Sequence, residues 1–522
     1  MGTIINKVVP IWCLVLAIVV APTNAEKMLE ESREDFMARV KDEIQVVFDE
    51  QTQTSAMWVG LSDPYYGDML FLFENDELIN RANNADDYYV PAAMEQNFDI
   101  GSISKTFGGT AAILLAERGD LALSDTVSDL VPDFAAQFPE YADYTVEELL
   151  RMKTIVPDFL NDEEGTFSSL CRVLLRIFNY VWNACHASSW LGYILLLEMF
   201  CSFCLSKCLN HDSPDPLFYF LIYTSKGILN DFALDITKRY STEDVVAYAM
   251  QKYPAELGTY STTNFVVLDF ILETVTGQSI QDVVKELILD PLGMESTVLP
   301  DRFSEGTHPD PSSTPYAGPA CRGEFVRYGF PNLALYQDMS EIAKGVVMAG
   351  TGGAINSNIT DLLTWAKSGT GDSLLSAEMV ELRHQYDNTL TAGVTYGIAQ
   401  YVYPSEYLDD PIYGLTYLKG WYGHSGDAFG FGAHAYRNDE LNASVATAVN
   451  TCSYSDVQLG AIKIFTEELQ KRNYTEVPTD PEGDGNGSGS GGAETTAAGN
   501  SMGSRWLHVG FTLALLVAGA IV

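Results

Sequence analysis

Residues 98–134 read FDIGSISKTFGGTAAILLAERGDLALSDTVSDLVPDF, and most of the recognisable chemistry lies at their beginning. The apolar spacing after Gly101 predicts a helix that runs to about Arg118 and stops at the glycine that follows. Ser102 lies at the start of this helix and Lys105 one turn later, so both side chains share one face. The positive potential of a helix N-terminus favours negative charge on the serine oxygen, and a buried lysine holds its proton weakly. The pair therefore predicts a nucleophilic serine with a lysine as its base.

The whole stretch resembles the active-site segment of serine β-lactamase-related hydrolases, especially the class C branch. That family includes class C β-lactamases, D-alanyl-D-alanine carboxypeptidases, D-aminopeptidases and β-lactamase-fold esterases. The resemblance implies that Ser102 is the acylated nucleophile and that Lys105 is its partner. Ser104, the remaining hydroxyl of the motif, is expected to be a packing residue at the helix start.

A second stretch, GTYSTTNF over residues 258–265, resembles the family's second motif, and the segments LETVTGQSI and DPLGM resemble the helix that follows it. The family tyrosine, which shares proton transfer with the lysine, maps to Tyr260. A phenol held near a cationic lysine is expected to have a lowered pKa and to move a proton. Thr262 stands where the family has an asparagine that contacts substrate and lysine, and Asn264 follows two residues later.

A third stretch, WYGHSGD over residues 421–427, resembles the strand that reads Lys-Thr-Gly in β-lactamases and His-x-Gly in many relatives. The resemblance implies an oxyanion hole formed by the backbone N–H groups of Ser102 and Asp427. The lysine that binds a β-lactam carboxylate is absent, so true β-lactamase activity is not expected. The implied substrate-contacting residues are His424, Ser425, Gly426 and Thr262.

One more family segment is matched and one is missing. Residues 352–357 (GGAINS), followed by Asp361-Leu362, match a recurring segment of the family. Leu149-Leu150, in contrast, is not followed by the His-Thr-Ser-Gly that many relatives carry at this point. The resemblance extends over roughly Lys41 to Gln470.

The order of predicted elements favours an α+β fold, in which an antiparallel sheet is flanked by helices and joined to an all-helical region, as in serine β-lactamases and penicillin-binding proteins. Extended patterns predict strands over residues 56–61, 69–73, 397–403 and 443–449. Helical apolar periods predict helices over residues 27–51, 146–152, 242–251, 279–287, 359–367 and 457–470.

The composition excludes several classes of function. The 522 residues include 70 Asp and Glu against 30 Lys and Arg, which gives a net charge of −40. Such an acidic surface repels phosphate backbones and anionic lipid headgroups, so nucleic-acid binding and an electrostatic membrane contact are not expected. Eight cysteines are too few for a fold built on disulfides at this length.

The two ends of the chain resemble targeting signals. Residues 1–25 predict a secretory signal peptide, with an uncleaved anchor as the alternative, and residues 26–475 are the expected hydrolase domain. Residues 476–505 form a Gly/Ser/Thr-rich linker, and the apolar tail 506–522 resembles a GPI-attachment signal, with a single membrane span as the alternative. The sequons at Asn358, Asn442, Asn473 and Asn486 fit this route. We therefore expect a secreted protein that is tethered to the cell surface at its C-terminus.

Residues 165–226 differ from the rest of the chain. Five of the eight cysteines are in this segment, and Glu198 is the only acidic residue between Thr166 and Asn210. The spacing of Cys201, Cys204, Cys208 and His211 could suggest zinc, but cysteines in an apolar run are more often small hydrophobic residues. We interpret the segment as an atypical insertion or a translated intron. The two cysteines left in the domain, Cys321 and Cys452, could pair in an oxidising compartment.

Together these features predict a serine hydrolase that cleaves an ester or amide bond, such as one in a D-amino-acid peptide, through an acyl-enzyme on Ser102. The alternative is a catalytically silent member of the fold that serves as a binding or scaffold protein. An α/β-hydrolase with Ser425 as nucleophile is excluded, because its Gly-x-Ser-x-Gly motif would need glycine at Asp427. The mechanism needs no metal or other cofactor, and the expected partner is a small molecule or a short peptide.

Overall fold

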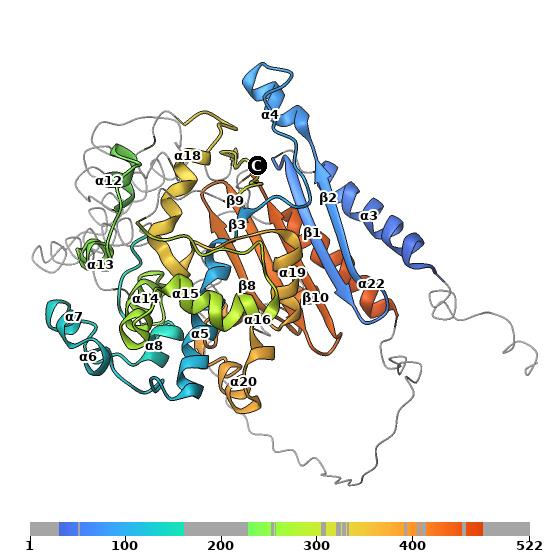
Figure 1. Cartoon of the computed structure of the whole chain (residues 1–522). Coiled ribbons are helices and arrows are strands. Elements are labelled where there is room, and N and C mark those ends of the chain that lie inside the picture. Colours follow the sequence, from blue (N-terminus) through green and yellow to red (C-terminus); the bar gives the residue numbers. More distant parts are fainter. Residues whose placement is uncertain are drawn as a thin grey trace, which may run out of the picture. The chain divides into compact units, whose positions relative to one another are not determined.

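The strands in the described part of the chain form an eight-stranded antiparallel sheet in the order β2-β1-β10-β9-β8-β7-β6-β5 and a separate pair, β3-β4 (Figure 1). The first strand pairs with the last one, so segments from the two ends of the domain lie side by side in the sheet, next to its β2 edge. The strands are β1 (Ala56–Asp63), β2 (Gly67–Glu74), β3 (Phe98–Asp99), β4 (Asn356–Ser357), β5 (Asn388–Thr389), β6 (Thr395–Tyr396), β7 (Tyr401–Val402), β8 (Trp421–Ala428), β9 (Phe431–Asn438) and β10 (Ala443–Val449).

The computed structural model describes residues 31–50, 53–160 and 228–472, with gaps at 252–254, 256, 304–308, 320–324, 326–329, 331–332, 391–393, 405–407, 409–413 and 452–455. The predicted signal peptide, insertion, linker and tail lie outside these residues, as do Cys321, Cys452, Asn473 and Asn486. None of the helices in the described ranges is both long and apolar enough to cross a membrane.

Helices cover both faces of the sheet. Helices α3 (Arg33–Glu50) and α22 (Asp456–Lys471) pack together on one side of it, and α19 (Ile359–Lys367) packs on β1, β9 and β10 (Figure 1). Every fourth residue of α3 is buried, the spacing that gives a helix one apolar face: Phe36, Val40, Ile44 and Phe48. The predicted helix over 27–51 is thus confirmed from Arg33 to Glu50.

An all-helical region lies beside the sheet and has an apolar cluster of its own. Phe134, Tyr141, Val246 and Ile271 belong to this cluster. Three of its helices, which start at Val127, Val146 and Thr242, begin at capping boxes, which satisfy free N–H groups of the first turn. The helices of this region are α6 (Val127–Leu130), α7 (Pro132–Gln137), α8 (Val146–Leu150), α12 (Ile228–Leu234), α13 (Thr242–Met250), α14 (Thr263–Thr276), α15 (Ile280–Val284), the π-helical turn η2 (Lys285–Leu289) and α16 (Asp290–Leu292).

Helix α5 (Ser104–Arg118) packs against both parts of the domain, and the short 3₁₀ helix η1 (Gly101–Ile103) precedes it. Every residue from Ser104 to Ile113 is buried, so the helix has no solvent face over its first turns. A Cβ at Gly108 would collide with Thr351, and one at Gly109 would collide with Ala399. The two glycines therefore let α5 approach its neighbours closely, and this fixes the position of the Ser102–Lys105 turn.

The predicted α+β fold is confirmed, with differences at element ends. The strand predicted over 397–403 contains only Tyr401 and Val402, because Ala399 adopts a left-handed conformation with φ 58° and its N–H donates to Leu150 O. The other short elements are α4 (Asp76–Asn83), α18 (Ser340–Ala343), η3 (Lys344–Gly352), η4 (Asp372–Leu374), α20 (Ala377–Arg383) and η5 (Thr416–Leu418).

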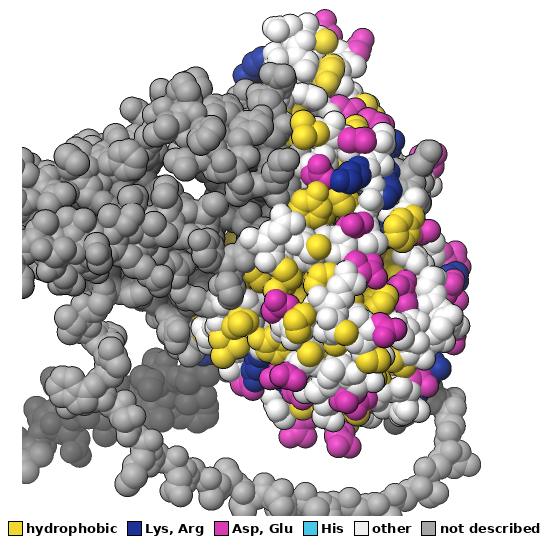
Figure 2. Space-filling model, turned by 90° about the vertical axis from the view of Figure 1, so that its left-hand side faces the viewer, with side chains coloured by type: hydrophobic (Ala, Val, Ile, Leu, Met, Phe, Trp, Pro, Cys, Tyr) yellow, Lys and Arg dark blue, Asp and Glu magenta, His cyan; other side chains and the backbone are white. Residues whose placement is uncertain are grey.

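The face of the domain drawn in Figure 2 carries acidic side chains spread between apolar ones, with fewer basic side chains among them. The acidic composition is therefore visible on this surface. A phosphate backbone would be repelled by these acidic side chains.

Candidate active site

Ser102 lies in η1, in close contact with strand β8. Gly101 has φ of +52°, a left-handed conformation that glycine adopts without cost. A Cβ at Gly101 would lie 2.6 Å from Asp427 N, so only glycine fits between η1 and the strand. The sequence Gly-Ser at this point therefore places the nucleophile beside the main chain of β8.

Lys105 is fully buried, and its Nζ lies 3.0 Å from Ser102 Oγ. The same nitrogen donates to Gly352 O, lies 3.2 Å from Thr262 Oγ1, and stands over the Tyr260 ring at 4.7 Å from its centroid. Burial lowers the pKa of Lys105 to about 7, while the charge of Asp158 opposes the shift. A large fraction of this lysine is therefore neutral at physiological pH and able to accept the serine proton.

The replacement of the family asparagine by threonine keeps the contact with the lysine. Thr262 is buried, and its hydroxyl lies between Lys105 Nζ and Asp158 Oδ2, which accepts from it at 3.2 Å. Asn264 does not replace the asparagine, because its side chain bonds to Thr154 and Leu149 instead. The chain of contacts Ser102–Lys105–Thr262–Asp158 therefore reaches a buried carboxylate.

The Tyr260 hydroxyl is buried beside Ser102 and has no hydrogen-bond partner within the part of the chain that the structure describes. Burial raises the pKa of Tyr260 well above its usual value, and neighbouring Tyr396 adds to the rise. The Ser102 side chain opposes this rise, although its geometry falls short of a hydrogen bond. The prediction from the sequence that the pKa of Tyr260 is lowered is thus wrong. Lys105 is protonated only in part, and its charge does not offset the complete burial of the phenol. Tyr260 remains a neutral phenol.

His424 is neutral and fully engaged. Burial, with some help from the charge of Lys105, lowers its pKa to about 3. Its Nε2 lies 2.9 Å from Tyr396 Oη, and its Nδ1 lies 2.5 Å from the carbonyl oxygen of Ser425. A carbonyl can only accept, so Nδ1 carries the proton and Nε2 accepts from the tyrosine. His424 therefore supports the β8 main chain and offers no charge to a substrate.

The other predicted residues of β8 lie close to the nucleophile. A Cβ at Gly426 would collide with Ile100 O and lie 2.6 Å from Ser102 N. This contact brings the predicted oxyanion-hole residues, Ser102 and Asp427, to the same place. The Ser425 hydroxyl accepts a hydrogen bond from Tyr401 Oη at 2.8 Å.

A buried carboxylate fixes the loop that carries Gly352, the first residue of the GGAINS segment. Asp269 accepts hydrogen bonds from the N–H and hydroxyl of Thr351. Burial raises the pKa of Asp269 to about 7, while Arg302 opposes the rise. Gly350 has φ of 54°, and a Cβ there would collide with this carboxylate. The loop is thus held so that Gly352 O faces the lysine.

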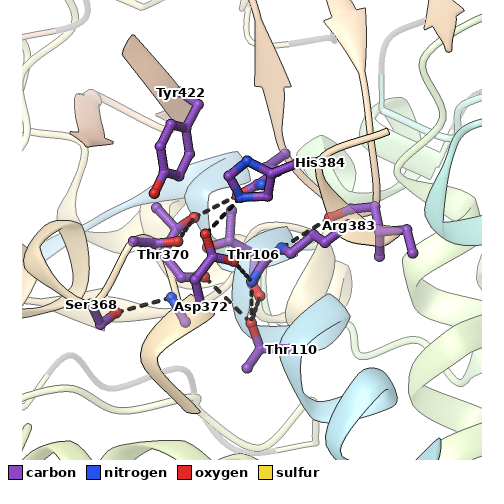
Figure 3. A network of polar contacts seen from close by, with 12 residues as sticks. Thr106, Thr110, Ser368, Thr370, Asp372, Arg383, His384 and Tyr422 are labelled. Carbon is purple, nitrogen blue, oxygen red and sulfur yellow. Dashed lines mark hydrogen bonds and ion pairs between the residues drawn. The ribbon is translucent and has the colours of Figure 1, made fainter. Parts of the chain in front are cut away.

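A polar network lies deeper in the domain, where α5 meets α20 and the sheet (Figure 3). Arg383 is buried and donates to Thr110 of α5 at 3.1 Å and to Asp372 at 3.3 Å. Asp372 also pairs with His384 at 2.7 Å, and the His384 ring packs on Tyr422 of β8. These contacts connect α5 to strand β8 and so help to fix the helix that follows Ser102 relative to the sheet.

Sequence reasoning missed Asp158, Asp269 and the tyrosines at positions 396, 401 and 436. Asp158 and Asp269 are two of 70 acidic residues in the chain, and no local pattern marks them. Ser104 is a packing residue, as expected, since its hydroxyl accepts from Ile355 N. No cluster of three metal-ligating side chains occurs in the ranges that the structure covers, and the Cys201–His211 spacing lies outside them.

The beta-lactamase family model matches residues 81–199 and 224–464. A D-stereospecific amidohydrolase from Streptomyces sp. is similar in structure, with 17% identity, a TM-score of 0.56 and coverage of 83% of this chain and 98% of that one. The D-amino acid amidase from Ochrobactrum anthropi SV3 complexed with D-phenylalanine gives 15% identity, a TM-score of 0.54 and coverage of 83% and 99%. The complex of the same amidase with L-phenylalanine amide gives 14% identity and a TM-score of 0.53, with coverage of 83% of this chain and 98% of that one. At these identities the likeness to the solved structures shows a shared fold.

Proposed function

Because the chain belongs to the beta-lactamase family of serine hydrolases, we propose that it cleaves amide or ester bonds of small substrates through an acyl-enzyme on Ser102. The observation that carries the proposal is the buried Lys105, whose pKa is about 7 and whose Nζ lies 3.0 Å from Ser102 Oγ. A neutral amine at that distance is within reach of the serine proton.

In the acylation step, Lys105 Nζ takes the Ser102 proton as Oγ bonds to the substrate carbonyl carbon. The carbonyl electrons move to the oxygen, which the N–H groups of Ser102 and Asp427 would stabilise. The C–N or C–O bond then breaks, and the leaving amine or alcohol receives a proton. The neutral Tyr260 hydroxyl is suited to donate it and to recover it from protonated Lys105.

Deacylation repeats these steps with water. Lys105 accepts a proton from the water as its oxygen attacks the ester carbon of the acyl-enzyme. The bond to Ser102 Oγ breaks, and the serine regains its proton from the lysine. The products are a carboxylic acid and the amine or alcohol released before. Hydrogen bonds that Lys105 Nζ donates to Thr262 Oγ1 and to the Gly352 carbonyl oxygen keep the amine beside Ser102 Oγ in both halves of the reaction.

We propose an amide of a D-amino acid as the substrate. The similar structures are named as a D-stereospecific amidohydrolase and a D-amino acid amidase, and the proposal extends their printed activity to this chain. Neutral His424, in the place of the β-lactamase lysine, gives no charge for a carboxylate. A β-lactam is accordingly the least suitable substrate.

The test is intact-mass labelling of the folded protein with a fluorophosphonate, with a Ser102→Ala variant beside it. One adduct on the wild type that is absent from the variant is the expected result, and D- and L-amino acid amides are then assayed for hydrolysis. If the folded wild type stays unlabelled, the hydrolase proposal fails and a silent binding or scaffold protein becomes the better reading. Thr262 favours the hydrolase, because it keeps a hydrogen bond to the lysine.

The buried carboxylate of Asp158 should set the pH at which the enzyme becomes active. Activity requires neutral Lys105, so kcat/KM is expected to rise with pH through a midpoint near 7. Asp158 raises the pKa of Lys105, and Asp158→Asn removes that negative charge. The midpoint of the variant is therefore expected at lower pH. A pH profile that moves to higher pH, or does not move, would contradict this role.

We also propose secretion and tethering at the cell surface, which the terminal segments of the sequence support. In that route Asn442 is the expected glycan site of the described sequons, because it is exposed at the turn between β9 and β10. Asn358 is only 7% exposed, and its side chain caps α19 by accepting from Asp361 N. Peptide mapping after enzymatic deglycosylation should find modified Asn442 and unmodified Asn358. A glycan on Asn358, or none on Asn442, would count against this reading.

A further inference from the structure

Strand β8 is paired on both edges only in its first half, as far as the described residues go. Strand β9 pairs with all of β8, whereas β7 pairs only with Tyr422 and Gly423. Strand β7 begins only at Tyr401, because the chain just before it turns at Ala399, which has φ of 58°. From His424 onward this edge of β8 thus faces η1 and the nucleophile in place of a further strand.

The main-chain groups of Ser425 on this edge already have partners. The Ser425 N–H donates to Tyr401 Oη at 3.1 Å, and the Ser425 carbonyl accepts from His424 Nδ1. The N–H and C=O of one residue in an antiparallel strand point to the same edge, so the two side chains cap the edge at this residue. Asp427, two residues later, points its main-chain groups the same way, toward Gly101.

Further hydrogen bonds hold the cap in place. Tyr401 is buried, donates to Ser425 Oγ at 2.8 Å, and lies 2.8 Å from Tyr436 Oη. His424 is fixed from its other side by Tyr396 Oη at 2.9 Å. An approaching substrate could free the Ser425 main chain only by breaking its buried hydrogen bonds to Tyr401 and His424. The cap is therefore a permanent part of the site.

We propose that the Tyr401–His424 cap restricts the enzyme to amides or esters of a single amino acid. This inference rests on the proposed hydrolase function and names its substrate class. A peptide that lay along β8 as a further strand would need the N–H of Ser425, which Tyr401 Oη already takes, and would have to share the Ser425 carbonyl with His424 Nδ1. A group that extends from the scissile carbonyl toward Tyr401 is accordingly small.

The test compares three probes: D-phenylalanine amide, D-phenylalanylglycine and glycyl-D-phenylalanine amide. The wild type is expected to hydrolyse the single-residue amide with a kcat/KM roughly tenfold or more above that of at least one extended probe. Tyr401→Phe keeps the ring and releases the Ser425 N–H. The ratio of kcat/KM for the single-residue amide to kcat/KM for the disfavoured extended probe should therefore fall several-fold. Tyr88→Phe, which removes the hydroxyl of an exposed tyrosine outside the cap, is the control and should keep the wild-type ratio of the two kcat/KM values.

Binding to Ser102→Ala, measured by calorimetry, separates the cap from the hydrolase activity. Tighter binding of the single-residue amide than of the disfavoured extended probe supports the cap, even if the wild type proves unable to form a fluorophosphonate adduct. Equal binding, binding of no probe, or an unchanged ratio in a folded Tyr401→Phe variant overturns the inference. Absence of the Ser102 adduct overturns the hydrolase proposal alone.

Discussion

Replacing Lys105 by methionine is expected to lower kcat/KM for an amino acid amide by about 10³-fold, within the range that a general base contributes. Methionine has a similar volume and suits a buried position, but it has no group that can take the Ser102 proton. The rate of fluorophosphonate labelling should fall with it, because the same proton must leave the serine. Amide hydrolysis and intact mass measured on one preparation give both numbers.

The Lys105→Arg variant distinguishes a base from a mere positive charge. Arginine keeps a charge and hydrogen-bond donors near Gly352 and Thr262, but it does not deprotonate in proteins. It is therefore expected to be as inactive as the methionine variant. Circular dichroism must first show that both variants are folded. Substantial activity in Lys105→Arg would mean that the lysine acts by charge alone, and the base would have to be sought elsewhere.

The sequence was sufficient for the fold and for the residues that come from local motifs. Ser102 and Lys105 are one turn apart on one helix, so their contact follows from spacing alone. The regular patterns also predicted α19 and β10 with the bounds that the structure has. The β9 strand was missed, although all eight of its residues pair with β8.

Contacts between distant segments could not be predicted in this way. Asp158 lies 104 residues from Thr262, and nothing in its neighbourhood marks it as part of the site. The segment after Leu149-Leu150 lacks the family motif, yet it has a structural role: Arg151 is buried and donates to the carbonyl groups of Leu382 and Gln385. The charge state of Tyr260 depends on complete burial, which a single sequence does not reveal.

Gly426→Ala is expected to reduce kcat by about 10²- to 10³-fold, the cost of losing one oxyanion-hole donor. The added Cβ would press against Ile100 O and lie 2.6 Å from Ser102 N, so η1 and β8 must move apart. The N–H groups of Ser102 and Asp427 would then no longer converge on one oxygen. KM should change less than kcat, because the loss concerns the transition state more than the bound substrate.

Gly353→Ala is the matched control for this prediction, since Gly353 also lies near Gly101. A Cβ there would meet Ala349 Cβ at 3.4 Å, an ordinary contact, and the variant should retain wild-type kcat. A boronic acid, which forms a tetrahedral adduct with an active serine, reports on the oxyanion hole without turnover. Its affinity should fall in Gly426→Ala in parallel with kcat and stay unchanged in Gly353→Ala. The result that would contradict this prediction is a Gly426→Ala variant with full boronate affinity and a reduced kcat. Other groups would then stabilise the oxyanion, and Gly426 would serve only to leave room for the substrate.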